Sequence, residues 1–152
     1  MSNSVVYAAV MLAAGLGIPT MAAVNGGLGG RLESPVLATT ILLIVALTIT
    51  VATLFATGSL RIPVPLSSIP WIFFTGGAFA AFYMLGITWA APKFGVANAV
   101  AFVLLGQLIA MTIIDHIGFA GAPQSAVTMQ RVIGLVLMAV GVVLVVNPRI
   151  DA

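Results

Sequence analysis

The chain has 152 residues, of which 62% are hydrophobic and only 5% are charged, with a formal net charge of +2 at neutral pH. Soluble domains carry roughly 25% charged residues, which cover their surface. This composition excludes a soluble domain and indicates an integral membrane protein.

Five apolar stretches are long enough to cross a membrane, since a spanning helix needs about 20 residues. We expect these helices at residues 5–28, 35–57, 71–91, 96–117 and 127–146. The first is expected to be retained, because no Lys or Arg precedes it as in a secretory signal. The predicted fold class is all-α integral membrane, a five-transmembrane-helix bundle that forms a single domain over residues 1–152.

Pro19 is expected to interrupt the first of these helices. It has no N–H, and its ring clashes with the carbonyl four residues back, at Gly15. Asn25 follows, just before a glycine-rich end. A broken helix with an amide side chain is how transporters present polar contacts at membrane depth. A packing role is the alternative, with Pro19 as a kink and Asn25 as an interhelical hydrogen bond, and both interpretations stay open.

Aromatic residues mark the third helix. Trp71 and Trp89 are 18 residues apart, which is about 27 Å of helix and close to the hydrocarbon thickness. We therefore interpret them as interfacial anchors. Phe82 and Tyr83 lie between them, and their faces would cover the apolar part of a solute and attract a cationic one.

The fourth helix carries two amides, Asn98 and Gln107. An amide side chain both donates and accepts hydrogen bonds, so it can replace the water around a solute. A Gln at this depth also bonds to neighbouring helices. We predict a transport cavity lined by the first, third and fourth helices. Its expected residues are Pro19, Asn25, Phe82, Tyr83, Asn98 and Gln107.

Asp115 and His116 close the fourth helix, and Arg131 opens the fifth. Asp115 is a candidate proton or cation acceptor, and His116 titrates near neutral pH. They are therefore the predicted coupling residues. The alternative places both at the water interface, where charge costs little. Consecutive helices put Arg131 on the same side as Asp115, so we expect an ion pair there.

Several kinds of site are excluded by the residue types present. There is no cysteine, and there are only one histidine and three acids, so we predict no catalytic triad, no metal site and no cofactor. The five basic residues stand singly along the chain. Because nucleic-acid binding needs clustered Lys and Arg, no nucleic-acid partner is expected.

The distribution of basic residues bears on orientation. With five spans, Arg31, Lys93 and Arg149 fall on one side of the membrane and Arg61 and Arg131 on the other. This difference is too small to fix one orientation under the positive-inside rule. It permits insertion in both directions, and hence an antiparallel (inverted) homodimer of ten helices.

Several motifs together resemble a known family, the DUF606 (YdcZ-like) branch of the drug/metabolite transporter superfamily. The resemblance covers nearly the whole chain, and the combination of Gly-Gln and Asp-His-x-Gly on one helix is its most specific part. The motifs are Gly17-Ile18-Pro19, Asn25-Gly26-Gly27-Leu28-Gly29, Glu33-Ser34-Pro35, Pro70-Trp71, Gly76-Gly77, Gly106-Gln107, Asp115-His116-Ile117-Gly118 and Arg131-Val132-Ile133-Gly134.

The resemblance implies a multi-pass carrier of the prokaryotic cytoplasmic (inner) membrane. It also implies a five-helix unit that works in pairs, since related ten-helix transporters contain two oppositely oriented units. The more distantly similar small multidrug exporters carry a glutamate within their first helix. Here no acid precedes Glu33, which lies in a loop, so proton-coupled export of cationic drugs is in doubt.

We therefore expect a secondary transporter of a small organic solute that works by alternating access as a dimer. One alternative is a non-transporting membrane subunit that packs against a partner protein. A small channel is another alternative, although a channel requires a ring of polar residues and this chain has few candidates for one. An enzyme has the least support, because acids, bases and nucleophiles are almost absent at membrane depth.

Overall fold

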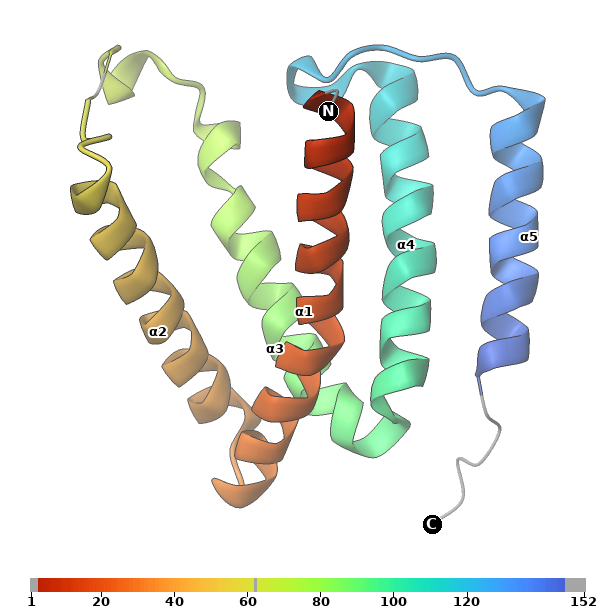
Figure 1. Ribbon diagram of the computed structural model, residues 1–152, viewed down its shortest axis with the longest axis horizontal. Coiled ribbons are helices and arrows are strands. Elements are labelled where there is room, and N and C mark those ends of the chain that lie inside the picture. Colours follow the sequence, from red (N-terminus) through yellow and green to blue (C-terminus); the bar gives the residue numbers. More distant parts are fainter. Residues whose placement is uncertain (1–2, 62, 147–152) are drawn as a thin grey trace. The chain divides into compact units, whose positions relative to one another are not determined.

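The computed structural model of the protein describes residues 3–61 and 63–146, and every long element in these ranges is an α-helix (Figure 1). Three short 3₁₀ helices lie in the connections, at Leu66–Ser68, Trp71–Phe74 and Phe119–Gly121. The all-α prediction is confirmed. The long helices are α1 (Asn3–Arg31), α2 (Pro35–Ala56), α3 (Gly76–Phe94), α4 (Val96–Ile117) and α5 (Met129–Val145).

Four helical segments are long and apolar enough to cross a membrane: Ser4–Arg31, Pro35–Ala56, Trp71–Phe94 and Val96–Ile117. The fifth apolar helix, α5, has 17 residues, or about 25 Å, which is shorter than the hydrocarbon layer of about 30 Å. The expected span at 127–146 is thus present as a shorter helix. Arg149, which entered the charge comparison, lies outside the described residues.

The connection between α1 and α2 is short because its residues stop one helix and start the next. Glu33 has a left-handed backbone, with φ of 50°. The hydroxyl of Ser34 accepts a hydrogen bond from the Leu37 backbone N–H at 3.2 Å, and Pro35 opens α2. A serine N-cap followed by proline is a typical helix start.

Two helices run past residues that were expected to interrupt or end them. α1 is continuous through Pro19 and through its glycines to Arg31, so the predicted interruption is wrong, and the helix ends three residues beyond the end expected at about residue 28. α3 likewise continues through Pro92 to Phe94, beyond the predicted end at residue 91. A proline removes one helical hydrogen bond, and neighbouring helices and hydroxyl groups can offset that loss in membrane helices.

The chain divides into two compact units. Unit 1 consists of the residues up to Thr20 together with those from Lys93 onward, and unit 2 is Met21–Pro92. The part of α1 up to Thr20 therefore belongs with α4 and α5, and the rest of α1 belongs with α2 and α3.

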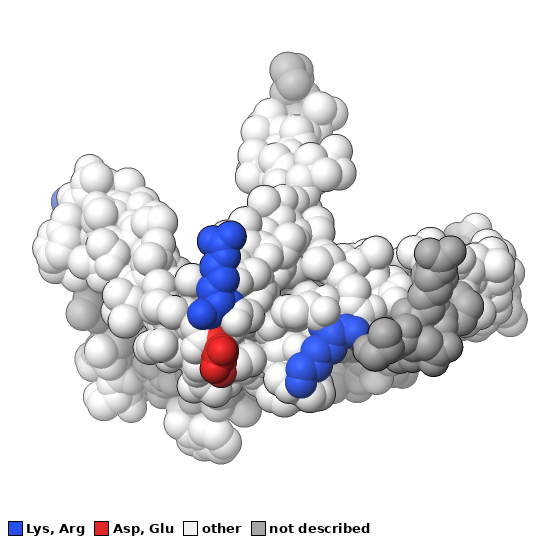
Figure 2. Space-filling model, turned by 90° about the horizontal axis from the view of Figure 1, so that it is seen from below, with Lys and Arg blue, Asp and Glu red and all other residues white. Residues whose placement is uncertain are grey.

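The surface of the molecule is almost uncharged. Figure 2 shows a face on which Lys, Arg, Asp and Glu form small spots among other residues. Large apolar side chains such as Leu12, Ile49, Phe79 and Leu144 are 70%, 61%, 73% and 80% exposed. Such a surface suits lipid rather than water.

Candidate functional site

The core of unit 2 is a close approach of small residues on one face of α1. Ala22, Asn25, Gly26 and Gly29 are buried, and their spacing of three, one and three residues puts them on one side of the helix. A Cβ at Gly26 would lie 3.0 Å from the ring of Pro92 in α3. Small residues therefore let the helix backbones meet, as is common between membrane helices.

Asn25 lies within this packed face rather than on an open surface. Its Nδ2 donates a hydrogen bond to Oγ1 of Thr88, at 2.5 Å, and both side chains are buried. This contact is the interhelical hydrogen bond that was one of the two interpretations of Asn25. A role of Asn25 in solute binding stays a prediction.

Two buried hydroxyl groups in unit 2 have no hydrogen-bond partner among the described residues, Thr39 Oγ1 and Tyr83 Oη. Thr39 is 1% exposed. The other four threonines of α2 all donate their side-chain hydroxyl to a backbone carbonyl of the same helix. They are Thr40, Thr48, Thr50 and Thr53. Because buried polar groups are normally satisfied, Thr39 and Tyr83 are the two described residues of this unit whose buried hydroxyl groups lack an expected partner.

Phe82 lines an apolar groove in unit 2, whereas its neighbour Tyr83 is half-buried. Phe82 itself is 79% exposed. The groove has a volume of about 390 Å³ and lies between the start of α2 and the second half of α3. Its lining residues are Pro35, Val36, Phe82, Leu85, Gly86 and Trp89.

In unit 1 the two amides of α4 lie on different faces. Asn98 is 8% exposed, and its Nδ2 donates to the backbone carbonyl of Phe94 at 2.8 Å. Gln107 is exposed. The two residues are nine apart, or about two and a half turns, so their side chains project in opposite directions. The structure does not bring Asn98 and Gln107 together.

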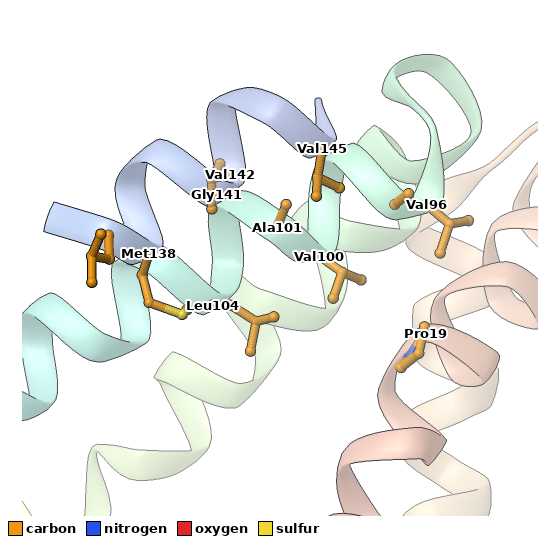
Figure 3. Close-up of a pocket in the computed structure, with 11 residues that line it drawn as sticks. Pro19, Val96, Val100, Ala101, Leu104, Met138, Gly141, Val142 and Val145 are labelled. Atoms are coloured by element: carbon orange, nitrogen blue, oxygen red, sulfur yellow. The ribbon is translucent and has the colours of Figure 1, made fainter. Parts of the chain in front are cut away.

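Pro19 lines a larger apolar groove of unit 1, with a volume of about 520 Å³ (Figure 3). The other walls come from the first half of α4, including Leu104, and from α5, including Met138 and Val142. Neither Asn98 nor Gln107 is among its lining residues. Pro19 therefore lines an apolar groove that the two amides of α4 do not line.

The expected ion pair at the end of α4 is confirmed. Nη1 of Arg131 lies 3.0 Å from Oδ2 of Asp115, and the two side chains are 40% and 25% exposed. The loop between α4 and α5 is attached to the same place. Ser125 donates its backbone N–H to the Asp115 carbonyl at 2.8 Å, and Gln124 Nε2 donates to the His116 carbonyl at 3.1 Å.

Comparison with known families decides what kind of protein this is. A family model described as "Putative inner membrane exporter, YdcZ" matches residues 6–144. The chain belongs to the YdcZ family. The resemblance found in the sequence is therefore confirmed. The chain matches no curated protein and no solved structure.

Membership of the YdcZ family, together with the apolar helices, makes this chain a multi-pass protein of the inner membrane. The family description is that of an exporter, which supports a transport role rather than an enzymatic one. Among residues 3–61 and 63–146, no group of three or more His, Asp or Glu side chains is placed to hold a metal ion.

Sequence reasoning missed the two fully buried threonines of this YdcZ protein, Thr39 and Thr88. Nothing in the sequence distinguishes Thr39 from Thr40, because the two are adjacent in an apolar helix. Thr88 could have been suspected from Asn25, since a buried amide needs a partner. Its location on α3, 63 residues away, follows only from the packing.

Proposed function

We propose that the protein is a secondary transporter that exports a small organic solute across the inner membrane by alternating access. In this proposal all five apolar helices cross the membrane. The working form is an antiparallel homodimer of ten helices. The family description supports export, and the observation that most supports a solute site is the placement of Gln107.

Gln107 is an exposed amide in the middle of an apolar helix. α4 runs from Val96 to Ile117, so Gln107 lies about 16 Å from its start, near mid-membrane. Among the residues that the structure describes, it has no hydrogen-bond partner. An unsatisfied amide in contact with lipid is costly. A polar contact from outside the single chain would therefore stabilise Gln107. A solute in a cavity between two copies would supply such a contact.

The solute contacts that we propose are of two kinds. Gln107 would bond the polar part of the solute, and the unpartnered hydroxyl of Tyr83 would add a second polar contact. Phe82, exposed in its apolar groove, would cover an aromatic or aliphatic part. Pro19, Asn25 and Asn98 complete the predicted lining; the contacts of Asn25 and Asn98 within their own units favour a supporting role for these two.

The dimer is proposed because alternating access needs two elements that move around a central site. One copy of this chain has few helices from which to build both. Two oppositely inserted copies would supply both elements, and the nearly balanced basic residues permit both orientations. The site would then lie near mid-membrane, at the depth of Gln107.

Asp115 and His116 are the proposed coupling residues. Asp115 is the only acid in a membrane-spanning helix of the described chain, and it lies beside Arg131. Release of Asp115 from Arg131 would let the carboxylate take up a proton or another cation during the cycle. The side chain of His116, next in the chain, is exposed and is the second proposed coupling residue.

The test is a screen of solutes for thermal stabilisation of the purified dimer in detergent, since a solute that binds the folded state raises its melting temperature. A hit should stabilise the native protein and bind Gln107→Ala at least about tenfold more weakly, a difference of about 1.4 kcal/mol. The matched control is Gln124→Ala, which changes a glutamine in the loop after α4. Equal binding to the native protein and to Gln107→Ala would reject the proposed site.

A non-transporting subunit remains the second candidate, and the same residue favours it. An exposed Gln107 would also suit a hydrogen bond to a helix of a different membrane protein. Reconstitution of the purified chain alone into vesicles separates the two candidates. Solute export from such vesicles supports the transporter, whereas transport that requires another subunit supports the alternative.

A further inference from the structure

Two grooves lie along α4 and α5 in unit 1, and we call them together the α4–α5 groove. One section has a volume of about 280 Å³ and is lined by residues that include Leu108, Arg131, Gly134 and Met138. The next section, of about 520 Å³, is the one that Pro19 lines. Met138 lines both sections, so they adjoin at that residue.

The α4–α5 groove is apolar along its length and has one charged group at one end. Its lining includes one charged residue, Arg131. Among the described residues that line it, the only other polar side chain is that of Thr112, whose hydroxyl donates to the Leu108 carbonyl of its own helix at 2.8 Å. The groove is therefore complementary to a molecule with one anionic end and a long apolar tail.

The length of the groove also fits such a molecule. Arg131 and Gly141 are ten residues apart on α5, which is about 15 Å along the helix. Half of the hydrocarbon layer is also about 15 Å, the depth that the acyl chains of one leaflet fill. A lipid with its phosphate at Arg131 would therefore place the end of its acyl chain near Gly141.

The α5 side of the groove is open at its two glycines. Gly134 lines one section and Gly141 the other, and being seven residues apart they lie on the same face of α5. A Cβ built on either glycine would meet no atom within 4 Å. Figure 3 shows Gly141 with Met138, Val142 and Val145 along this side. The glycines thus leave room for an extended chain.

We propose that the α4–α5 groove binds one anionic phospholipid of the surrounding bilayer, with its phosphate on Arg131 and one acyl chain along Gly134 and Gly141. Asp115 accepts a hydrogen bond from Nη1 of Arg131. A guanidinium has five N–H donors, so a phosphate can bind the same guanidinium. A second copy of the chain fits this charge less well. The chain has three acidic residues in all, and one of them is the Asp115 that already pairs with Arg131.

The test measures lipid binding by native mass spectrometry of the purified protein in neutral detergent. The probes are phosphatidylglycerol, phosphatidylcholine with the same acyl chains, and glycerol phosphate. We expect phosphatidylglycerol to bind most tightly and Arg131→Gln to weaken it about fivefold, the effect of one basic residue near an anionic headgroup. Arg61→Gln, the same change in a loop, is the matched control and should bind as the native protein does. Equal binding of both phospholipids, or unchanged binding to Arg131→Gln, overturns the proposal.

Two further variants separate the acyl chain from the charge. Gly134→Leu and Gly141→Leu fill the groove and leave Arg131 in place, so they should lower phosphatidylglycerol binding. Gly106→Leu fills open space on α4 outside the groove and should not. Asp115→Asn removes the competing carboxylate and should keep or strengthen lipid binding, even if Arg131→Gln fails to fold. If glycerol phosphate alone competes with phosphatidylglycerol, the proposal is overturned. It is also overturned if the glycine variants lose the dimer while lipid binding is unchanged.

Discussion

The guanidinium of Arg131 donates a hydrogen bond to the carboxylate of Asp115 at 3.0 Å, which joins the start of α5 to the end of α4. The two residues are 16 apart in the chain. Both side chains are partly exposed, at 40% and 25%, so the pair should contribute only about 0–1 kcal/mol to stability. A contact that stabilises so little can be broken and re-formed during a transport cycle.

Asp115→Asn should abolish the pH dependence of transport while leaving the dimer folded. The amide keeps the size of the side chain and can still accept a hydrogen bond from Arg131, but it cannot take up a proton. Transport into or out of vesicles at several pH values checks this, with Glu33→Gln in the α1–α2 connection as the control. If Asp115→Asn keeps the native pH dependence, Asp115 is an interfacial anchor.

Asn25→Ala should lower the stability of the protein by about 1–2 kcal/mol, because it leaves the buried Thr88 without its partner. Thr88→Val, which keeps the shape of the side chain, should destabilise by a similar amount. Unfolding in mixed micelles measures both. The double variant should cost clearly less than the sum of the two single changes, since the residues share one hydrogen bond. Additive effects would show that the bond contributes little.

The solute affinity of Asn25→Ala then separates its two roles. If solute binding, corrected for the lower stability, is unchanged, Asn25 serves packing alone. A loss of binding that Thr88→Val does not reproduce would give Asn25 a direct contact with the solute. Thermal shifts at a series of solute concentrations provide the affinities for both variants.

Gly26→Ala should destabilise the protein, whereas Gly27→Ala should not. A Cβ at Gly26 would lie 3.0 Å and 3.3 Å from Cγ and Cδ of Pro92, and that ring cannot swing away as a flexible side chain would. Overpacking of this kind costs about 1–3 kcal/mol. A Cβ at Gly27 meets nothing within 4 Å. Equal melting temperatures for the two variants would contradict the close approach of α1 and α3.

Reporters fused to the C-terminus should be active on both sides of the membrane. The reason is that three basic residues face one side and two the other in the predicted topology, which leaves the orientation undecided. Arg61→Gln should shift the population toward one orientation, because it increases the difference in basic residues. Activity of the native fusion on one side only would rule out the antiparallel dimer.

The boundaries of α4 could be predicted from the sequence, and those of α1 could not. Gly95 and Gly118 flank α4, and both have left-handed backbones, with φ of 90° and 65°, so they do mark its ends. Gly29 and Gly30 have the same residue type but lie inside α1. Gly29 lies at a helix contact, where a Cβ would be 3.4 Å from Cα of Pro35 and from Cγ2 of Thr88. A glycine at a helix end and a glycine at a helix contact look alike in a sequence.

The residue types of the candidate site could be predicted from the sequence, and its expected arrangement, a cavity lined by the first, third and fourth helices, stays a prediction. Gln107 was expected to be polar and deep in the membrane, and that follows from its place in an apolar run. Its exposure, and the burial of Asn98 on the opposite face, depend on how α4 is rotated about its axis. The unpartnered hydroxyl of Thr39 was not predicted, because four other threonines in α2 satisfy theirs locally.

The sequence by itself determined that this is an all-helical membrane protein, because 5% charged residues cannot cover a soluble surface and long apolar runs satisfy their backbone only as helices. It also indicated that Arg131 pairs with Asp115, since consecutive helices return to the same side. Only the tertiary structure decided that Asn25 bonds to Thr88 and that Gly134 and Gly141 open onto one groove. Those relations depend on how each helix is rotated about its axis, which packing between distant residues sets.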